Sequence, residues 1–259
     1  MNGESDSVVL EGISRDFDGT RALDRIDLRV RRGEFFGFLG PNGAGKSTTI
    51  KILSAQLRPT EGRALVLGHD VVREPLEIKR RIGVLPEEIN VYERLTADEL
   101  LRFTGRMHRL PDDVITQRTE DLYRLMELGE DDRHRLIVDD SMGTKKKIVL
   151  ACALLHNPKV LFLDEPFNGI DAVTARAIRS VLTSATERGV TIFFSSHVLE
   201  VVEKLCTRLA IVHRGRIRAQ GTLDDVCRQA ELPAGSALED AFVELVGGEV
   251  ERGDLEWMS

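Results

Sequence analysis

A phosphate-loop pattern, G-x-x-x-x-G-K-[ST], begins at residue 40 and reads Gly40-Pro41-Asn42-Gly43-Ala44-Gly45-Lys46-Ser47. An apolar run at residues 35–39 precedes the loop and a helical pattern at residues 47–57 follows it, as the pattern requires. Glycines let backbone N–H groups curl around a triphosphate, and the helix start adds the positive end of its dipole. The sequence therefore predicts that Lys46 reaches the β- and γ-phosphates and that Ser47 binds Mg²⁺.

A second acidic element follows the apolar residues 160–163, where Asp164 and Glu165 stand side by side. A strand of this kind ends at the edge of the sheet where α/β proteins bind ligands. Two neighbouring acids alone are more typical of a solvated strand end. With Lys46 upstream, we expect Asp164 to hold Mg²⁺ through water and Glu165 to orient or deprotonate an attacking water.

Strands alternate with helices over much of the chain, which predicts an α/β protein with a largely parallel sheet and helices on its faces. The helical segment between the early and late strands predicts an inserted subdomain. The predicted strands are residues 8–13, 23–30, 35–39, 64–67, 82–85, 160–163, 190–194, 208–212 and 217–220. The predicted helices are residues 47–57, 96–108, 111–128, 141–156, 172–187 and 197–205.

Composition limits the classes of function. Lys plus Arg number 36 against 43 Asp plus Glu, and this net charge of −7 argues against nucleic acid as the main partner. Cys152, Cys206 and Cys227 are far apart and odd in number, which is typical of reduced, intracellular thiols. Residues 1–7 do not form a signal peptide, and the longest apolar run, residues 148–155, is shorter than the ~20 residues that span a bilayer. We therefore expect any membrane-spanning part to come from another chain.

The order of these motifs carries a family resemblance. Asp164 follows Lys46 by 118 residues, and Asp171 and then His197 come after it. This arrangement resembles the nucleotide-binding subunits of ABC (ATP-binding cassette) transporters, over residues 8 to about 248. The resemblance implies the ABC ATPase fold: an α/β P-loop NTPase core with an antiparallel β-subdomain and an inserted helical subdomain.

The same resemblance divides the chain into regions. Residues 237–245 look like the C-terminal helix of the ABC-2-type exporter branch. The implied regions are residues 1–86 and 158–221 for the ATP-binding core with its β-subdomain, 87–157 for the helical subdomain with its signature motif, and 222–259 for a C-terminal helical extension and tail.

Several residues take roles by matching the family pattern. Phe17 is expected to stack on adenine, and His197 to contact the γ-phosphate and hold Glu165. Asp171 matches the loop through which two cassettes touch. The full expected nucleotide-binding set is Phe17, Gly40, Pro41, Asn42, Gly43, Ala44, Gly45, Lys46, Ser47, Thr48, Ser141, Gly143 and Asp171.

The signature motif, usually Leu-Ser-Gly-Gly-Gln, departs from the family pattern here. Ser141 and Gly143 are retained, and the resemblance implies that they contact the γ-phosphate bound by a partner chain. Asp140, Met142 and Thr144 replace the usual residues. The Met resembles exporter-type variants, whereas Asp140 either caps the following helix or weakens the site.

A run of three lysines, residues 145–147, follows the signature motif. It is more typical of a solvated helix face. A contribution to phosphate attraction is the alternative.

Glu87 stands where the family usually has Gln. The family residue touches Mg²⁺ and the attacking water, and a carboxylate can still ligate Mg²⁺. The resemblance places the following residues near a groove that receives the membrane subunit. Val91, Tyr92 and Leu95 are candidate contacts there, or else core residues.

The predicted function is an ATP-binding and ATP-hydrolysing subunit that powers an ABC transporter, of the exporter type by resemblance. The implied partners are separate multi-span membrane subunits and a second ATP-binding subunit, with the chain peripheral on the cytoplasmic face of the cell membrane and no nucleic acid bound. Two alternatives remain. One is a soluble non-transport ABC ATPase of translation or DNA repair. The other is a weakly active regulatory cassette, which Asp140 and Glu87 make plausible.

Overall fold

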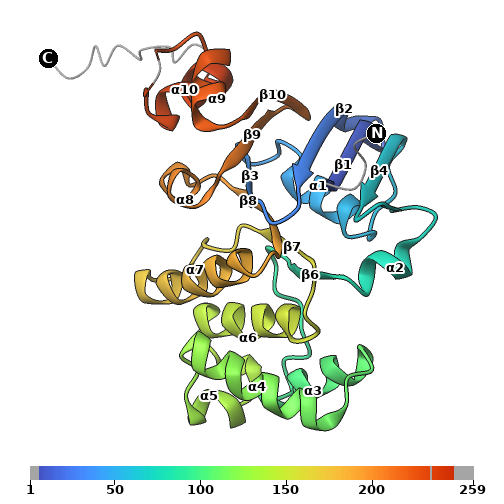
Figure 1. The fold of residues 1–259 in the computed structure, drawn as a ribbon, viewed down its shortest axis with the longest axis vertical. Coiled ribbons are helices and arrows are strands. Elements are labelled where there is room, and N and C mark those ends of the chain that lie inside the picture. The colour runs from blue at the N-terminus through green and yellow to red at the C-terminus, as the bar shows by residue number, and fades with distance from the viewer. Residues whose placement is uncertain (1–5, 234, 248–259) are drawn as a thin grey trace, which may run out of the picture.

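The computed structural model describes residues 6–233 and 235–247, which form two sheets and a helical block (Figure 1). The strands are β1 (Asp6–Phe17), β2 (Thr20–Arg31), β3 (Phe35–Leu39), β4 (Glu61–Val66), β5 (His69–Asp70), β6 (Ile82–Leu85), β7 (Val160–Asp164), β8 (Thr191–Ser196), β9 (Arg208–His213) and β10 (Arg216–Gly221). The helices are α1 (Lys46–Leu53), α2 (Pro75–Lys79), α3 (Ala97–Met107), α4 (Asp112–Met126), α5 (Glu130–His134), the 3₁₀ turn η1 (Ile137–Asp139), α6 (Met142–Leu155), α7 (Ala172–Glu187), α8 (Leu199–Leu205), α9 (Leu223–Gln229) and α10 (Leu238–Val246).

The larger sheet has the strand order β10-β9-β3-β8-β7-β6, and all its pairings are parallel except the β9–β10 hairpin. The side chains of successive residues in its strands point to opposite faces of the sheet, and each face packs against its own hydrophobic core. Phe36 and Phe38 pack on Phe193 on one face, while Phe35 meets Phe194 edge to face on the other. Burial on both faces explains why these strands read as continuous apolar runs rather than as alternating ones.

The smaller sheet, β2-β1-β4-β5, is antiparallel throughout. It shares a core with α1, in which Val8 and Leu10 of β1 are buried together with Ile50 and Leu53 of the helix. Helix α1 also contacts β7 of the larger sheet, so it lies between the two sheets. The expected α/β core with an antiparallel β-subdomain is confirmed.

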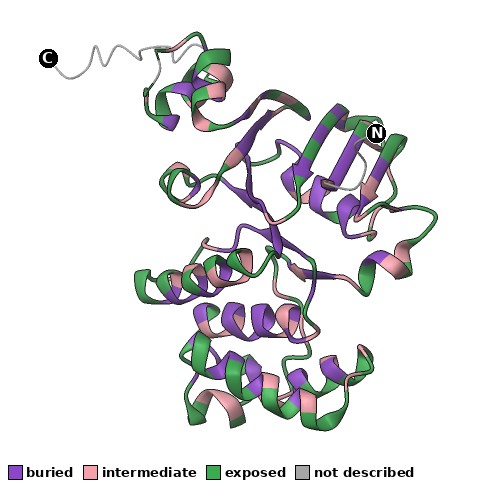
Figure 2. Ribbon diagram, in the orientation of Figure 1, coloured by how far each residue is buried: buried purple, intermediate pink, exposed green. Residues whose placement is uncertain are grey.

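Helices α3, α4, α5 and α6 form a separate block at the end of the molecule away from the smaller sheet (Figure 1). α6 is the most buried of them (Figure 2) and connects the block to β6 and α7. A capping box opens α3: Thr96 Oγ1 accepts from Glu99 N at 3.2 Å, and Glu99 Oε2 accepts from Thr96 N at 2.9 Å.

The predicted elements differ from the structure mainly at their ends. Helix α1 stops at Leu53, four residues before the predicted end, because Ala55 adopts a left-handed φ of 55° and Gln56 N turns back to Lys51 O at 2.9 Å. Helix α8 begins at Leu199 rather than at residue 197. The short elements β5, α2, α5 and η1 were not predicted. Helix α9 was not predicted as a separate helix, although it lies within the expected C-terminal helical extension.

The C-terminal region contains the predicted helix as α10, which buries Leu238 and Ala241 against α8, α9 and the β9–β10 hairpin. Residues 248–259, including the predicted tail, lie outside the described residues. Within the part of the chain that the structure describes, none of the helices combines the length and the apolar character needed to cross a bilayer.

A pair of stacked imidazole rings joins the helical block to the sheet. His156, just after α6, stacks on His108 with ring centroids 3.8 Å apart, and its Nε2 donates to Ile82 O at 2.9 Å. Burial, followed by the charge of His108, lowers the pKa of His156 to about 4. The folded protein therefore holds this ring neutral at pH values where the unfolded chain protonates it.

We expect His156→Gln to flatten the pH dependence of stability between pH 7 and pH 5. In the parent, the unfolded chain takes up a proton near pH 6.5 and the folded chain only near pH 4, so the free energy of unfolding falls as the pH falls. This one group accounts for up to about 2 kcal/mol by pH 5. Urea unfolding of both proteins at pH 7.5 and pH 5.0 measures the difference. Equal pH slopes in the two proteins would contradict the assignment.

Candidate active site

The phosphate loop connects β3 to α1 at the carboxyl end of the larger sheet. Its shape requires glycine at two positions. A Cβ on Gly40 would lie 2.3 Å from Val212 O, and one on Gly45, whose φ is 105°, would lie 2.5 Å from Leu23 Cδ2. The loop is further tied to the β9–β10 hairpin by a bond from Gly215 N to Ala44 O at 3.1 Å.

A pocket of about 330 Å³ lies over this loop. Two acidic side chains from distant parts of the sequence, Glu87 and Glu165, reach it. The structure therefore brings both carboxylates to the predicted phosphate loop. The lining residues are Ala22, Pro41, Asn42, Gly43, Ala44, Gly45, Lys46, Ser47, Thr48, Glu87 and Glu165.

Lys46 is buried, with only 6% of its surface exposed. Its ammonium group donates to Gly40 O at 2.7 Å and to Pro41 O at 3.2 Å. Nζ also lies 3.2 Å from Glu165 Oε1. The lysine thus folds back over the loop and neutralises the carboxylate that follows β7.

Glu165 is held from several sides. Its other carboxylate oxygen, Oε2, lies 3.0 Å from His197 Nδ1, and its backbone N donates to Ser195 Oγ at 3.0 Å. The φ of Glu165 is 48°, a left-handed conformation that a residue with a side chain rarely adopts. Lys46, Glu165 and His197, predicted as a functional group, do meet at one place.

The oxygen-bearing side chains here suit Mg²⁺, which prefers oxygen ligands. Asp164 is buried and accepts from Ser195 Oγ at 2.5 Å, yet no cationic side chain of residues 6–233 and 235–247 lies within ion-pair distance of it. A buried carboxylate without a counter-ion favours a bound cation. Ser47 and Glu87 supply further oxygens from the pocket wall.

Phe17 lies at the end of β1 and is 40% exposed, so its ring is available to a ligand. The guanidinium of Arg15 sits 4.5 Å from the ring centroid and covers part of the ring. Phe17 is not among the residues that line the pocket over the phosphate loop.

The signature residues lie away from this pocket. Ser141 is the N-cap of α6, where its Oγ accepts from Thr144 N at 3.1 Å. Gly143 packs against Thr174, since a Cβ there would lie 3.0 Å from Thr174 Oγ1. Asp171 caps α7, and the bonds from the backbone and hydroxyl of Thr174 lower the pKa of its carboxyl. The single chain therefore does not bring Ser141, Gly143 and Asp171 to its own phosphate loop.

Asp140 does not cap α6, because Ser141 holds that position. Instead its Oδ1 accepts from Arg135 Nε at 2.9 Å and from Nη2 at 2.7 Å. Its Oδ2 is buried and has no partner within the described part of the chain. The capping alternative for Asp140 is therefore wrong.

The prediction of a solvated face for the three lysines is also wrong. Only Lys145 pairs at the surface, with Glu93 at 2.9 Å, while Lys146 is 2% exposed and Lys147 is buried. Lys146 and Lys147 lie three and four residues after Gly143, which is itself buried. This helical spacing is the signal that places them on the inner face of α6.

The three apolar candidates for a membrane-subunit contact divide into two kinds. Val91 and Leu95 are partly buried against the core. Tyr92 is 65% exposed and meets Phe103 edge to face at 5.7 Å. Only Tyr92 presents most of its surface to solvent.

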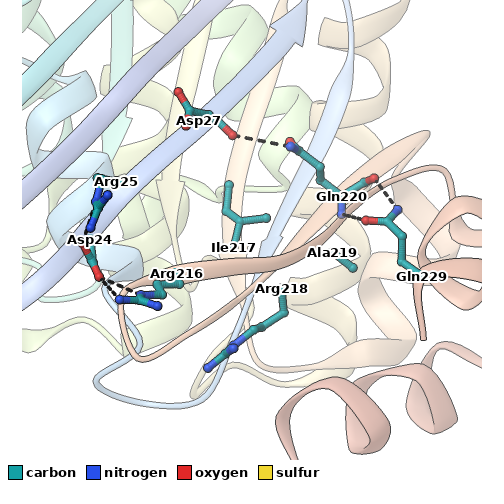
Figure 3. Close-up of a pocket in the computed structure, with 9 residues that line it drawn as sticks. All are labelled: Asp24, Arg25, Asp27, Arg216, Ile217, Arg218, Ala219, Gln220 and Gln229. Atoms are coloured by element: carbon teal, nitrogen blue, oxygen red, sulfur yellow. Dashed lines mark hydrogen bonds and ion pairs between the residues drawn. The ribbon is translucent and has the colours of Figure 1, made fainter. Parts of the chain in front are cut away.

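A second hollow, between β2, β10 and α9, contains none of the predicted site residues (Figure 3). Its polar groups largely satisfy one another. Arg216 pairs with Asp24, and Gln220 exchanges hydrogen bonds with Gln229 at 2.9 and 3.2 Å. The interactions drawn in Figure 3 are therefore internal to the hollow, and Arg218 takes no part in them.

Comparison with known proteins supports the same family. A family model described as ABC transporter matches residues 23–168. The Escherichia coli protein YbhF, named a probable multidrug ABC transporter ATP-binding protein, is 34% identical over 255 residues, which are 95% of this chain and 43% of YbhF. The chain thus spans less than half the length of that relative. The daunorubicin resistance ATP-binding protein DrrA3 of Streptomyces coeruleorubidus is 36% identical over 220 residues, 85% of this chain and 69% of DrrA3.

Among solved structures, an ATP-binding subunit of an ABC transporter superposes with a TM-score of 0.86. It is 32% identical, and the match covers 92% of this chain and 98% of that one. The fold and the sequence matches agree, and the chain belongs to the ABC transporter family of ATP-binding cassettes.

Proposed function

We propose that this chain binds and hydrolyses ATP to power an ABC transporter of the exporter type, together with separate multi-span membrane subunits on whose cytoplasmic face it works. The observation that carries the proposal is the meeting of Lys46, Glu165 and His197 over the phosphate loop. The names of the relatives YbhF and DrrA3, one a multidrug transporter protein and one a resistance protein, favour export.

ATP binding begins with an exchange of partners at Lys46. The β- and γ-phosphates replace Gly40 O, Pro41 O and the carboxylate of Glu165 around the ammonium group. Backbone N–H groups of the loop and the start of α1 complete the phosphate cradle, with Thr48 next to Ser47. Phe17 stacks on the adenine base.

Hydrolysis uses the carboxylate that this exchange releases. Glu165 Oε1, no longer paired with Lys46, accepts a proton from the attacking water or orients it. His197 holds the other carboxylate oxygen and reaches the γ-phosphate. Ser47, Asp164 and Glu87 would hold Mg²⁺, which when bound neutralises phosphate charge.

Two chains are needed for a complete site in this proposal. Ser141 and Gly143, at the start of α6, lie away from their own phosphate loop and would contact the γ-phosphate held by a second ATP-binding subunit. Asp171 would lie at the contact between the two. ATP, touching both halves, favours the closed dimer, and hydrolysis reopens it.

The test is a pull-down of tagged Glu165→Gln protein from detergent-solubilised membranes of its own host, with ATP and Mg²⁺. The closed state should hold its partners longest, so a polytopic membrane protein should co-purify in stoichiometric amount. The matched control is the same protein without nucleotide, which should retain less of that partner. If the protein instead recovers ribosomes, DNA or no partner, the proposed ATPase activity stands and the proposed role in transport is refuted.

A further inference from the structure

We propose that Lys146 is a positioning residue for ATP hydrolysis: it holds the backbone of Glu165 and the residues after it, and it links that segment to the signature helix α6. This inference rests on the proposed function. It concerns the lysine run that the sequence pattern assigned to solvent.

The ammonium group of Lys146 donates all its hydrogen bonds to backbone carbonyls of residues 165–168. It donates to Glu165 O at 2.8 Å, to Asn168 O at 2.6 Å and to Pro166 O at 3.4 Å. A lysine has three N–H donors and here meets three carbonyl acceptors. None of the donors of Lys146 is left for a phosphate, so the alternative of phosphate attraction does not apply to this lysine.

The held segment begins at a strained residue. Glu165 adopts its left-handed φ of 48° while three of its polar groups are bound elsewhere: N by Ser195, Oε2 by His197 and O by Lys146. A conformation of this kind costs about 1–3 kcal/mol and persists only where the surroundings fix it. The carbonyl oxygen of Glu165 accepts from Lys146 Nζ at 2.8 Å and also from Asn168 N at 3.2 Å. The bond from Lys146 is the shorter of the two, and it is the one that connects this carbonyl to α6.

A second contact ties the same segment to the same helix. Thr174, at the start of α7, packs on Gly143 and donates to Asp171 Oδ2 at 2.7 Å. The chain from Glu165 to Thr174 is thus attached to α6 at both ends. A shift at the N-terminus of α6, where a partner's ATP would bind, is therefore passed to the catalytic carboxylate of this chain.

Lysine is chemically suited to this position despite its burial. Burial lowers the pKa of Lys146, and the negative charges of Glu165, Glu87 and Asp164 oppose that shift. The surrounding carboxylates therefore favour the charged form, which alone supplies three donors.

The experiment compares Lys146→Met with Lys145→Met. Methionine is similar in length to lysine and lacks its N–H donors. Lys145 is the matched control, because it is the adjacent lysine and its ammonium group pairs with Glu93 in an exposed contact. We expect Lys146→Met to lower kcat for ATP about 10- to 100-fold, because small displacements of a catalytic group cost this much. KM should change less than threefold, and Lys145→Met should match the parent.

A second readout does not depend on turnover. Without nucleotide, amide hydrogen exchange of the peptide that covers Glu165–Asp171 should accelerate at least tenfold in Lys146→Met and remain unchanged in Lys145→Met. If Lys146→Met does not fold, Lys146→Gln, which keeps two donors, replaces it with the same expected direction.

Several results would overturn the inference. One is a kcat within twofold of the parent in a folded Lys146 variant. Another is hydrogen exchange of the Glu165–Asp171 peptide that stays at the parent rate in a folded Lys146 variant. A third is exchange that accelerates equally over the whole chain, which would indicate a general loss of fold rather than loss of a local contact. If the parent itself does not hydrolyse ATP, the proposed function fails, and unchanged exchange in the variant would then separately refute the positioning role.

Discussion

Glu165→Gln should lower the rate of ATP hydrolysis by about 10²- to 10⁴-fold while ATP binding is retained, the range typical for loss of a general base. The substitution keeps the shape of the side chain and removes its charge. Gln can still meet His197 across 3.0 Å, so the pocket stays intact. What disappears is the group that accepts a proton from water, and ATP-bound dimers should therefore accumulate.

Phosphate release and size-exclusion chromatography with ATP and Mg²⁺ measure these two effects. Glu187→Gln is the matched control, because Glu187 is an exposed carboxylate at the end of α7, away from the phosphate loop. Its turnover should equal that of the parent. Turnover of Glu165→Gln at the parent rate would show that Glu165 is not the base.

The sequence predicted those parts of the site that local pattern determines. The phosphate loop needs glycine at positions 40 and 45 for steric reasons that act within a few ångströms, so its signature is short and readable. The apolar run before Asp164 is readable for a similar reason, since a strand buried on both faces cannot alternate. The pairing of Glu165 with His197 was expected from resemblance alone. It depends on β7 and β8 lying side by side in the sheet, and the sequence of neither strand indicates its neighbour.

Other features depended on contacts that local pattern does not encode. Lys146 is buried because three carbonyls converge on it from a segment about 20 residues further along the chain, and such convergence exists only in the folded protein. The missed elements α2 and α5 have five residues each, too few for a helical period to repeat. Asp140 was ambiguous because its partner, Arg135, could not be identified before the structure.

Lys46→Ala should weaken ATP binding by about 10- to 100-fold, which corresponds to the 1.5–3 kcal/mol of a hydrogen bond to a charged group. The buried ammonium group of Lys46 is the only side-chain cation within 4 Å of the Glu165 carboxylate among the described residues, apart from His197 if protonated. Its loss removes both the contact to the phosphates and the counter-ion of that carboxylate. Titration with a fluorescent ATP analogue measures the affinity.

Lys51→Ala is the control for that variant, since Lys51 lies on the same helix with its side chain exposed. Its affinity should match that of the parent, and thermal unfolding of both variants checks that they are folded. Unchanged ATP affinity in a folded Lys46→Ala protein would refute the phosphate-loop assignment.

Because Lys46 and Glu165 form an ion pair, we expect Glu165→Gln and Lys46→Ala to change the affinity for ATP in opposite directions. In the parent, the Glu165 carboxylate lies 3.2 Å from Lys46 Nζ. ATP must displace it before the phosphates can contact the ammonium group. Glu165→Gln removes that competitor, so it should bind ATP more tightly than the parent, whereas Lys46→Ala binds more weakly. In the double variant the gain from Glu165→Gln should shrink, because the lysine for which carboxylate and phosphate compete is absent. A double-mutant cycle on ATP affinity therefore measures the competition directly, and additivity of the two changes would mean that the pair does not oppose nucleotide binding.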